Sequence, residues 1–204
     1  MRVGLADVAG TGHGGTGHYS VTGFPTAAPQ APVLVVESII IPGPQTAEGV
    51  LITANTVALY DMIRRLGANW QSAAYELTWR QWEELLAGVY QDAGYEVTLT
   101  RPSGDHGCDV IAQRNGFDCL KVRIQMKRYK PDLVVTAEQA RALLGTLYGD
   151  PAASKAVLAT TSRFAPRILQ DPAVGPAVPT RLQLWDGEDL QELFKRVERG
   201  EAKL

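Results

Sequence analysis

A carboxylate, an amide and an ammonium group stand near one another in the middle of the chain, at Asp109, Gln125 and Lys127. Gln125 and Lys127 are two residues apart in a stretch of alternating apolar and polar residues, and every second residue of a strand points to the same face of its sheet. Asp109 begins the preceding stretch, and the Asn115-Gly116 turn would bring its carboxylate to the same edge. Carboxylate and amide oxygens bind hard cations such as Mg²⁺, and an ammonium group can orient an attacking water or stabilise charge on a phosphate. These residue types favour metal-assisted hydrolysis of a phosphodiester.

The strand expected over residues 119 to 129 is the element on which this prediction depends. The face expected to meet the core carries Leu120, Val122, Ile124 and Met126. The face expected to meet a cleft or solvent carries Lys121, Arg123, Gln125 and Lys127. Such alternation is typical of any half-buried strand, so Gln125 and Lys127 alone indicate little. Their combination with Asp109 and the turn makes a compact site of the kind that phosphodiester hydrolysis needs.

Helices and strands are expected to alternate around this hairpin. Thr78 is expected to cap a helix that ends at Gly94 and buries one face, formed by Trp82, Leu85, Leu86 and Val89. Further helices are expected over residues 55–66, 136–148, 162–169 and 188–197, and further strands over 95–100, 109–112, 155–160 and 181–185. This order predicts an α/β sandwich with a central mixed sheet flanked by helices.

The first 74 residues differ from the rest. Residues 1–32 are rich in Gly, Pro and Thr and are expected to form a flexible tail. The GxGxxG match at residues 10–15 is not followed by a helix, so we expect no dinucleotide site there. Residues 33–74 are expected to form a small element, with an apolar strand over 33–41 that Gly43-Pro44 terminates. This element could be a subdomain, a dimerisation piece or a partner-docking surface.

The charge of the whole chain says little about its partner. The net charge is -2 and the pI is about 5.9, which neither supports nor excludes binding to nucleic acid. Within residues 101–130, however, seven basic residues stand against three acidic ones. A local excess of this kind suits a phosphate backbone, although ordinary scatter of surface charges can produce it as well.

The cysteines and the hydropathy bear on the compartment. Cys108 and Cys119 have the spacing of neither a disulfide framework nor a zinc site. We interpret them as reduced thiols in a cytoplasmic protein, with a disulfide between them as the less favoured alternative. No secretory signal and no apolar run long enough to cross a bilayer are visible, so we expect no membrane association.

The run SGDHGCDVIA, followed by VRIQMKRYK, resembles the catalytic core of Mrr-type restriction endonucleases, a branch of the PD-(D/E)xK superfamily with a QxK triplet. The resemblance extends upstream to LTWRQWEELLAGVYQDAGYEV and downstream to VLATTSRF and LQLWDGEDL. It covers about residues 77 to 195 and is specific in the stretch from 109 to 130. It implies a three-layer restriction-endonuclease-like sandwich, with the nuclease domain spanning residues 75–204.

The resemblance also implies roles for individual residues. Asp109 would be the principal metal ligand, Gln125 would fill the acidic slot, and Lys127 would be the catalytic lysine. Glu83 would assist metal binding or hold the site together, although its neighbour Glu84 is an open alternative. The expected cofactor is Mg²⁺, for which Mn²⁺ can substitute. Residues expected to contact DNA are Arg101, Ser103, His106, Arg123, Arg128 and Lys130; His106 stands where the family commonly has glycine.

The resemblance implies a metal-dependent endodeoxyribonuclease that restricts foreign or modified DNA, similar to type IV restriction enzymes. A DNA-repair or junction-resolving nuclease is an alternative, since the same core serves both. A non-catalytic DNA-binding or partner-docking module on this scaffold is a second alternative. No helix-turn-helix or zinc-finger pattern precedes the core, so a homodimer or a partner subunit could supply target recognition.

Overall fold

The computed structural model of the chain describes residues 38–101, 108–116, 119–201 and 204, and divides the chain into two units, Met1–Val35 and Val36–Leu204. The predicted tail and its GxGxxG match lie outside the described residues.

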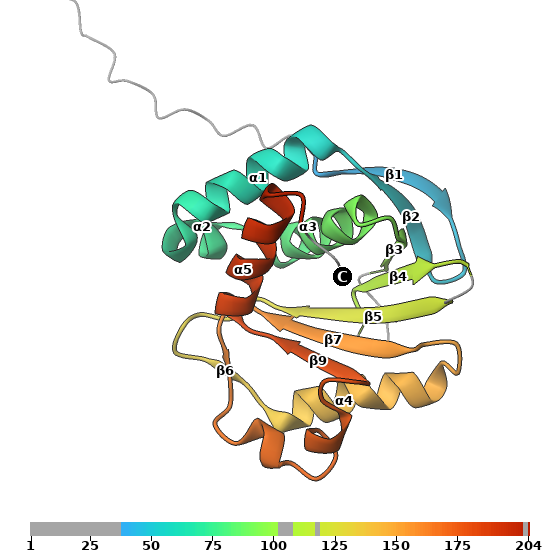
Figure 1. The fold of residues 1–204 in the computed structure, drawn as a ribbon, viewed down its shortest axis with the longest axis vertical. Coiled ribbons are helices and arrows are strands. Elements are labelled where there is room, and N and C mark those ends of the chain that lie inside the picture. The colour runs from blue at the N-terminus through green and yellow to red at the C-terminus, as the bar shows by residue number, and fades with distance from the viewer. Residues whose placement is uncertain (1–37, 102–107, 117–118, 202–203) are drawn as a thin grey trace, which may run out of the picture. The chain divides into compact units, whose positions relative to one another are not determined.

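A mixed seven-stranded sheet forms the centre of the second unit (Figure 1). Its strands follow the spatial order β1-β2-β3-β4-β5-β7-β9. Each strand up to β5 is antiparallel to its neighbour, whereas β5, β7 and β9 are parallel to one another. Their bounds are β1 Ile40–Gln45, β2 Gly49–Ala54, β3 Glu96–Thr100, β4 Val110–Arg114, β5 Leu120–Lys127, β7 Lys155–Thr160 and β9 Leu182–Trp185.

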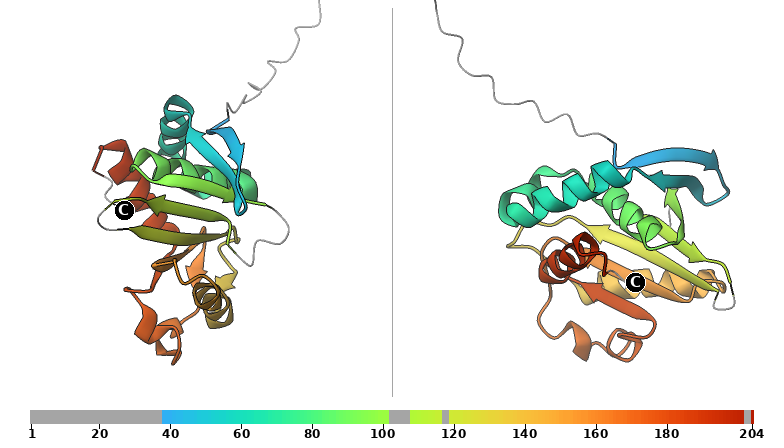
Figure 2. Two further views of the ribbon diagram at one scale, coloured as in Figure 1. Left: turned by 90° about the vertical axis from the view of Figure 1, so that its right-hand side faces the viewer. Right: turned by 45° about the horizontal axis from the view of Figure 1, so that its top comes forward.

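Helices cover both faces of the sheet, as Figures 1 and 2 show. One face carries four helices, α1 Thr56–Ala68, α2 Trp70–Glu76, α3 Trp79–Asp92 and α5 Gly187–Glu198. The other face carries α4 Ala137–Gly149, which makes the crossover between the parallel strands β5 and β7. Near α4 lie a small parallel pair, β6 Val134–Val135 and β8 Arg163–Phe164, and two 3-10 turns, Ile168–Gln170 and Gly175–Ala177. The predicted three-layer sandwich with a mixed sheet is confirmed.

Two apolar clusters, one on each face, explain why the layers hold together. On the four-helix face, Trp82 of α3 is fully buried and stacks on Phe194 of α5, with ring centroids 6.1 Å apart. Ile124 of β5 belongs to the same cluster. On the other face, Leu143 of α4 packs with Leu158 of β7. Burial of such side chains stabilises a fold by about 1.5–3 kcal/mol each.

Helix α3 begins where its capping residues predict. The Thr78 hydroxyl accepts the N–H of Gln81 at 3.2 Å, and the Gln81 side chain accepts the N–H of Thr78 at 2.9 Å. This reciprocal pair satisfies two donors that the first turn of a helix leaves without partners. The predicted helix after Thr78 is confirmed, and its start fixes which side chains of α3 face the sheet.

The small element predicted for residues 33–74 contributes directly to the main sheet. Strand β2 pairs with β3, and Ile52 and Leu59 lie in the same buried cluster as Trp82. The predicted end of the first strand at Gly43-Pro44 is wrong, because β1 continues through these residues with an irregularity in its pairing after Pro42. Proline is tolerated there since β1 is an edge strand.

The helix predicted over residues 162–169 is also wrong. The segment forms strand β8 and then a 3-10 turn. Pro166 lacks the N–H that a helix needs, and Arg167 adopts the left-handed region with φ 68°. Phe164 and Ile168 both pack on the α4 cluster, and their spacing of four residues is also the spacing of one buried helical face. Helix α2 was not predicted at all.

Within the described part of the chain, no helix combines the length and the apolar character that crossing a membrane requires.

Candidate active site

The predicted catalytic residues gather at one end of the sheet. Leu99 pairs with Val110, and Val110 pairs with Ile124, so the end of β3, the start of β4 and the end of β5 meet there. The parallel strand β7 ends at the same place, where Lys127 pairs with Thr160. Topology alone therefore brings Asp109 to the last residues of β5.

Asp109 is held between the two strands by hydrogen bonds at both its backbone and its side chain. Its N–H donates to the carbonyl of Ile124 at 2.9 Å, and its carbonyl accepts the N–H of Thr100 at 3.1 Å. Its carboxylate oxygen Oδ2 accepts the backbone N–H of Met126 at 2.7 Å. Met126 stands between Gln125 and Lys127, so the Asp109 carboxylate lies against the QxK triplet as predicted.

Gln125 and Lys127 differ from the other polar residues of their strand face. Lys121 and Arg123 both bind Asp150, at 2.9 and 3.0 Å. For the side chains of Gln125 and Lys127, by contrast, the structure gives no hydrogen bond or ion pair with any described residue. Gln125 is only 7% exposed. Its amide atoms are nevertheless not among the buried side-chain atoms that lack a partner, so the amide still reaches solvent beside Lys127.

The polar face of β5 is more covered than predicted. The sequence placed it against a cleft or solvent, yet Lys121, Arg123 and Gln125 are buried and Lys127 is half-buried. The apolar face meets the core as predicted, through Val122, Ile124 and Met126.

Glu83 approaches this end of the sheet from α3. Its side chain is buried, and Arg80 of the same helix binds it at 3.0 Å. The same Arg80 guanidinium donates to the carbonyl of Thr100 at 3.4 Å, and Thr100 in turn binds Asp109. Glu83 is thereby linked to the strand ends through Arg80, for which the sequence pattern predicted no role.

The structure distinguishes Glu83 from Glu84. Glu84 is partly exposed and lies 3.6 Å from Arg80, and burial raises the pKa of its carboxyl while the Arg80 charge opposes that rise. Glu83 is the one of the two that is enclosed against the sheet, since it is 2% exposed. A carboxylate buried so deeply requires a counter-charge, which Arg80 provides.

The segment that follows Lys127 is fixed by Thr161, just beyond β7. The Thr161 hydroxyl accepts the N–H of Tyr129 at 2.9 Å and donates to the Tyr129 carbonyl at 2.7 Å. Thr161 also donates its own N–H to the Lys127 carbonyl at 3.2 Å. The backbone on both sides of Arg128 is therefore tied to the neighbouring strand.

The residues predicted to contact DNA have different environments. Arg101 and Lys130 are exposed near the site, whereas Ser103 and His106 lie outside the described residues. Arg128 is exposed, but its guanidinium donates to the Tyr75 carbonyl at 2.5 Å. Arg123, expected to face DNA, is 9% exposed and paired with Asp150.

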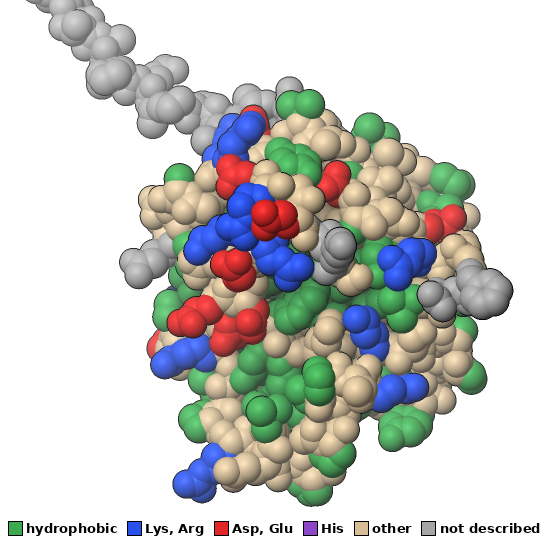
Figure 3. Space-filling model, viewed as in Figure 1, with side chains coloured by type: hydrophobic (Ala, Val, Ile, Leu, Met, Phe, Trp, Pro, Cys, Tyr) green, Lys and Arg blue, Asp and Glu red, His purple; other side chains and the backbone are tan. Residues whose placement is uncertain are grey.

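The basic residues counted between 101 and 130 do not form one surface. Arg114 lies at the far end of β4, where its guanidinium stacks on the Tyr95 ring at 5.1 Å. Elsewhere, on the face drawn in Figure 3, acidic and basic side chains are interleaved over α5. The local charge excess in the sequence thus reduces to a few exposed cations beside the strand ends.

Both cysteines are free thiols. Cys108, next to Asp109, is buried, and this burial raises the pKa of its thiol to about 12. A thiol with so high a pKa stays protonated and is neither a nucleophile nor a soft metal ligand.

The donor set suits a hard cation. Asp109 offers a charged oxygen and Gln125 a neutral amide oxygen, both of which Mg²⁺ or Mn²⁺ accepts as ligands. Within the described residues, no three His, Cys, Asp or Glu side chains converge into a metal cluster. Water and substrate phosphate would therefore have to complete the shell, which is the usual arrangement for Mg²⁺.

A mixed sheet with helices on both faces, and an aspartate beside a QxK triplet on the adjacent strand, define a restriction-endonuclease-like domain. The model of the Mrr catalytic-domain family, described as "Restriction endonuclease", matches residues 74–194. The chain belongs to this family, whose members are DNA nucleases. No curated protein sequence matches the chain.

Among solved structures, similarity extends to the MspJI restriction endonuclease in complex with a 27-mer oligonucleotide, with 20% identity, a TM-score of 0.44, and coverage of 71% of this chain and 33% of that one. It extends to the DNA modification-dependent restriction endonuclease AspBHI, with 19% identity, a TM-score of 0.44, and coverage of 79% and 40%. A third is the restriction endonuclease FokI, with 13% identity, a TM-score of 0.45, and coverage of 72% and 32%. The chain thus spans less than half the length of these three enzymes.

Proposed function

We propose that this chain is a metal-dependent endonuclease that hydrolyses DNA phosphodiester bonds. The observation that carries the proposal is the hydrogen bond between the Asp109 carboxylate and the Met126 N–H, which sets the carboxylate beside Gln125 and Lys127. Membership of the restriction endonuclease family supports DNA as the substrate.

The residues divide the chemistry among them. Asp109 and Gln125 would hold Mg²⁺ or Mn²⁺, which when bound polarises a phosphoryl oxygen and makes water a better nucleophile. Lys127 orients that water or stabilises the charge that develops on the phosphate. Glu83, linked to Asp109 through Arg80 and Thr100, stabilises the arrangement at the strand ends. Exposed Arg101 and Lys130 are placed to neutralise flanking phosphates.

We further propose that the biological role is restriction of foreign or modified DNA, with target choice supplied by a second copy or a partner subunit. The family membership supports this role. A repair or junction-resolving nuclease would use the same site, and the choice of substrate separates the two.

The test is cleavage of supercoiled plasmid, methylated and unmethylated, and of a four-way junction, in Mg²⁺, Mn²⁺ or EDTA. Wild type is compared with Asp109→Ala and Lys127→Ala, and with Lys195→Ala as a control on the exposed face of α5. Metal-dependent cutting that both site variants lose and the control retains supports the proposal. Preference for the junction would favour repair, and preference for methylated plasmid would favour restriction of modified DNA.

Binding of DNA by all four folded proteins without any cutting would overturn the nuclease assignment. That result would favour a non-catalytic DNA-binding module on the same scaffold.

A further inference from the structure

A groove runs beside the polar face of β5, on the side of the sheet that α4 covers. It encloses about 450 Å³ and is lined by Arg123, Ala142, Gly145, Thr146, Gly149 and Asp150. Arg123 lies two residues before Gln125 on the same strand face, or roughly 6.6 Å along the strand. The groove therefore continues the candidate active site along β5.

The helical wall of the groove is made of small residues. Ala142, Gly145 and Gly149 lie at intervals of three and four residues, so they share one face of α4. All three are exposed, and a Cβ at either glycine would meet no atom within 4 Å. Glycine is unfavourable inside a helix by about 1 kcal/mol relative to alanine, and here it keeps the space above β5 open.

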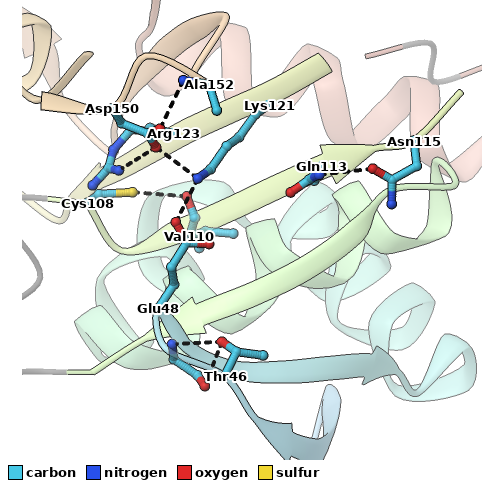
Figure 4. A network of polar contacts seen from close by, with 11 residues as sticks. Thr46, Glu48, Cys108, Val110, Gln113, Asn115, Lys121, Arg123, Asp150 and Ala152 are labelled. Carbon is cyan, nitrogen blue, oxygen red and sulfur yellow. Dashed lines mark hydrogen bonds and ion pairs between the residues drawn. The ribbon is translucent and has the colours of Figure 1, made fainter. Parts of the chain in front are cut away.

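The strand wall holds a cation whose donors are not all used. Figure 4 shows Arg123 and Lys121 directed at Asp150. Arg123 is 9% exposed, and its Nε is buried without a hydrogen-bond partner among the described residues. A buried donor left without an acceptor costs about 1–3 kcal/mol. Guanidinium groups bind phosphate or carboxylate well, because their donors form a planar fork.

The ion pairs around Arg123 join two cations to two carboxylates. Lys121 and Arg123 share Asp150, and the second partner of Lys121 is Glu48, at 2.6 Å. The side chain of Glu48 is 45% exposed, so solvent screens it, whereas that of Arg123 is 11% exposed. The two cations are therefore more deeply buried than the two carboxylates that pair with them, since the side chain of Asp150 is 16% exposed.

We propose that this α4 groove binds a phosphate of the DNA strand adjacent to the phosphodiester that is cut, with Arg123 as its cation and the small face of α4 as its wall. This inference rests on the proposed function, since it places the phosphate in line with Gln125 and Lys127. It assigns to Gly145 and Gly149 the task of letting the sugar-phosphate backbone approach β5.

The test measures binding of a labelled DNA duplex in EDTA, where no cutting occurs, over a series of salt concentrations. Arg123→Gln removes the cation, and Gly145→Leu fills the groove without changing any charge. Gly67→Leu is the matched control, because Gly67 is an exposed glycine of α1 at which a Cβ also meets nothing within 4 Å. Thermal unfolding establishes that each variant folds. If Arg123→Gln does not fold, DNA binding by Gly145→Leu alone tests the inference.

We expect both groove variants to bind DNA about tenfold more weakly than wild type at 0.1 M salt, and the slope of log affinity against log salt to fall by about 0.9 for one lost phosphate contact. Gly67→Leu keeps the wild-type affinity and slope. Wild-type binding by folded Gly145→Leu overturns the inference, even when plasmid cleavage still depends on Asp109 and Lys127.

The two proposals fail separately. If the groove variants bind DNA more weakly but wild type never cuts DNA, the phosphate site is supported and the nuclease assignment is wrong. Wild type that binds no DNA overturns both. A last experiment measures thermal stability in inorganic phosphate against chloride of the same ionic strength. If free phosphate stabilises the protein but the groove variants bind DNA as wild type does, the groove binds a small anion and the inference is overturned.

Discussion

The carboxylate of Asp109 and the backbone N–H of Met126 are joined by a hydrogen bond of 2.7 Å, which ties a polar site to the hydrophobic core. The Met126 side chain is buried on the four-helix face of the sheet, while its neighbours Gln125 and Lys127 project to the other face. The core therefore fixes the backbone of β5, and β5 fixes the carboxylate.

Asp109→Asn keeps the size of the side chain and removes its charge. We expect DNA cleavage to fall at least about 100-fold, since the principal charged ligand is lost. Mg²⁺ should also stop stabilising the fold; for wild type at 100 times the dissociation constant, linkage gives about 2.7 kcal/mol. Thermal shift with and without Mg²⁺ measures this, and Asp132→Asn, an exposed site in the loop after β5, is the control. An Mg²⁺ shift that persists in Asp109→Asn would place the metal elsewhere.

Arg80 and Glu83 should behave as one energetic unit. Removing the Arg80 charge leaves the buried Glu83 carboxylate without this partner, so Arg80→Gln should cost about 1–2 kcal/mol of unfolding free energy. Glu83→Gln in the Arg80→Gln background should recover part of the loss. A double-mutant cycle by urea unfolding gives the coupling energy, with Arg64 and Asp61, an exposed pair on α1, as the reference cycle. Additive losses within experimental error would contradict the coupling.

The sequence predicted the parts of this site that depend on local patterns. Alternation along residues 120–127 indicated the strand and its buried face, and the hairpin placed Asp109 beside it. Arg80 was not predicted, because a charged residue in the first turn of an amphipathic helix usually faces solvent. Its role arises from a contact with Thr100, twenty residues later in the chain, which no local pattern encodes.

Long-range packing also explains why Arg123 was assigned to an open surface. The residue that buries and pairs it, Asp150, lies at the end of α4 and 27 residues further along the chain. The alternation in β5 gives the direction of the Arg123 side chain but not what covers it. The helix predicted over residues 162–169 is wrong for a related reason: contacts with the α4 cluster select the conformation of this segment, and Pro166 lacks the N–H that a helix needs.

Asp150 should make the stability depend on pH. Partial burial alone would raise the pKa of its carboxyl, but the hydrogen bonds and charges of Lys121 and Arg123 outweigh burial and lower that pKa. A folded pKa below the unfolded value gives stability that is present above the unfolded pKa and is lost as the pH falls through the folded one. We expect wild type to lose this contribution below about pH 4. Asp150→Asn should lose about 3 kcal/mol at pH 7 and show a smaller acid dependence in urea titrations.

The same ion pairs act at the alkaline end through Lys121. Burial alone would lower the pKa of its ammonium, yet the hydrogen bonds to Asp150 and Glu48 raise it above the ordinary value. Its contribution is therefore complete below the unfolded pKa and disappears as the pH rises through the folded one. Asp150→Asn should weaken this dependence too, and an unchanged alkaline limb would mean that Glu48 alone holds Lys121.

Thr161 should control the reaction through the position of Lys127 and not through any contact with DNA. Thr161→Val keeps the shape of the side chain but removes the hydroxyl that binds both the N–H and the carbonyl of Tyr129. The backbone after Lys127 then has two polar groups to satisfy elsewhere, which costs about 1–3 kcal/mol of stability. We expect kcat to fall about tenfold while KM for the DNA changes little, because a displaced catalytic group loses rate before it loses binding.

Thr161→Ser, which keeps the hydroxyl, should restore kcat. Ser162→Ala is the matched control at the next residue, since its hydroxyl binds the Leu133 carbonyl and not the Tyr129 backbone. Equal loss of kcat in Thr161→Val and Ser162→Ala would reduce the effect to general destabilisation of the loop.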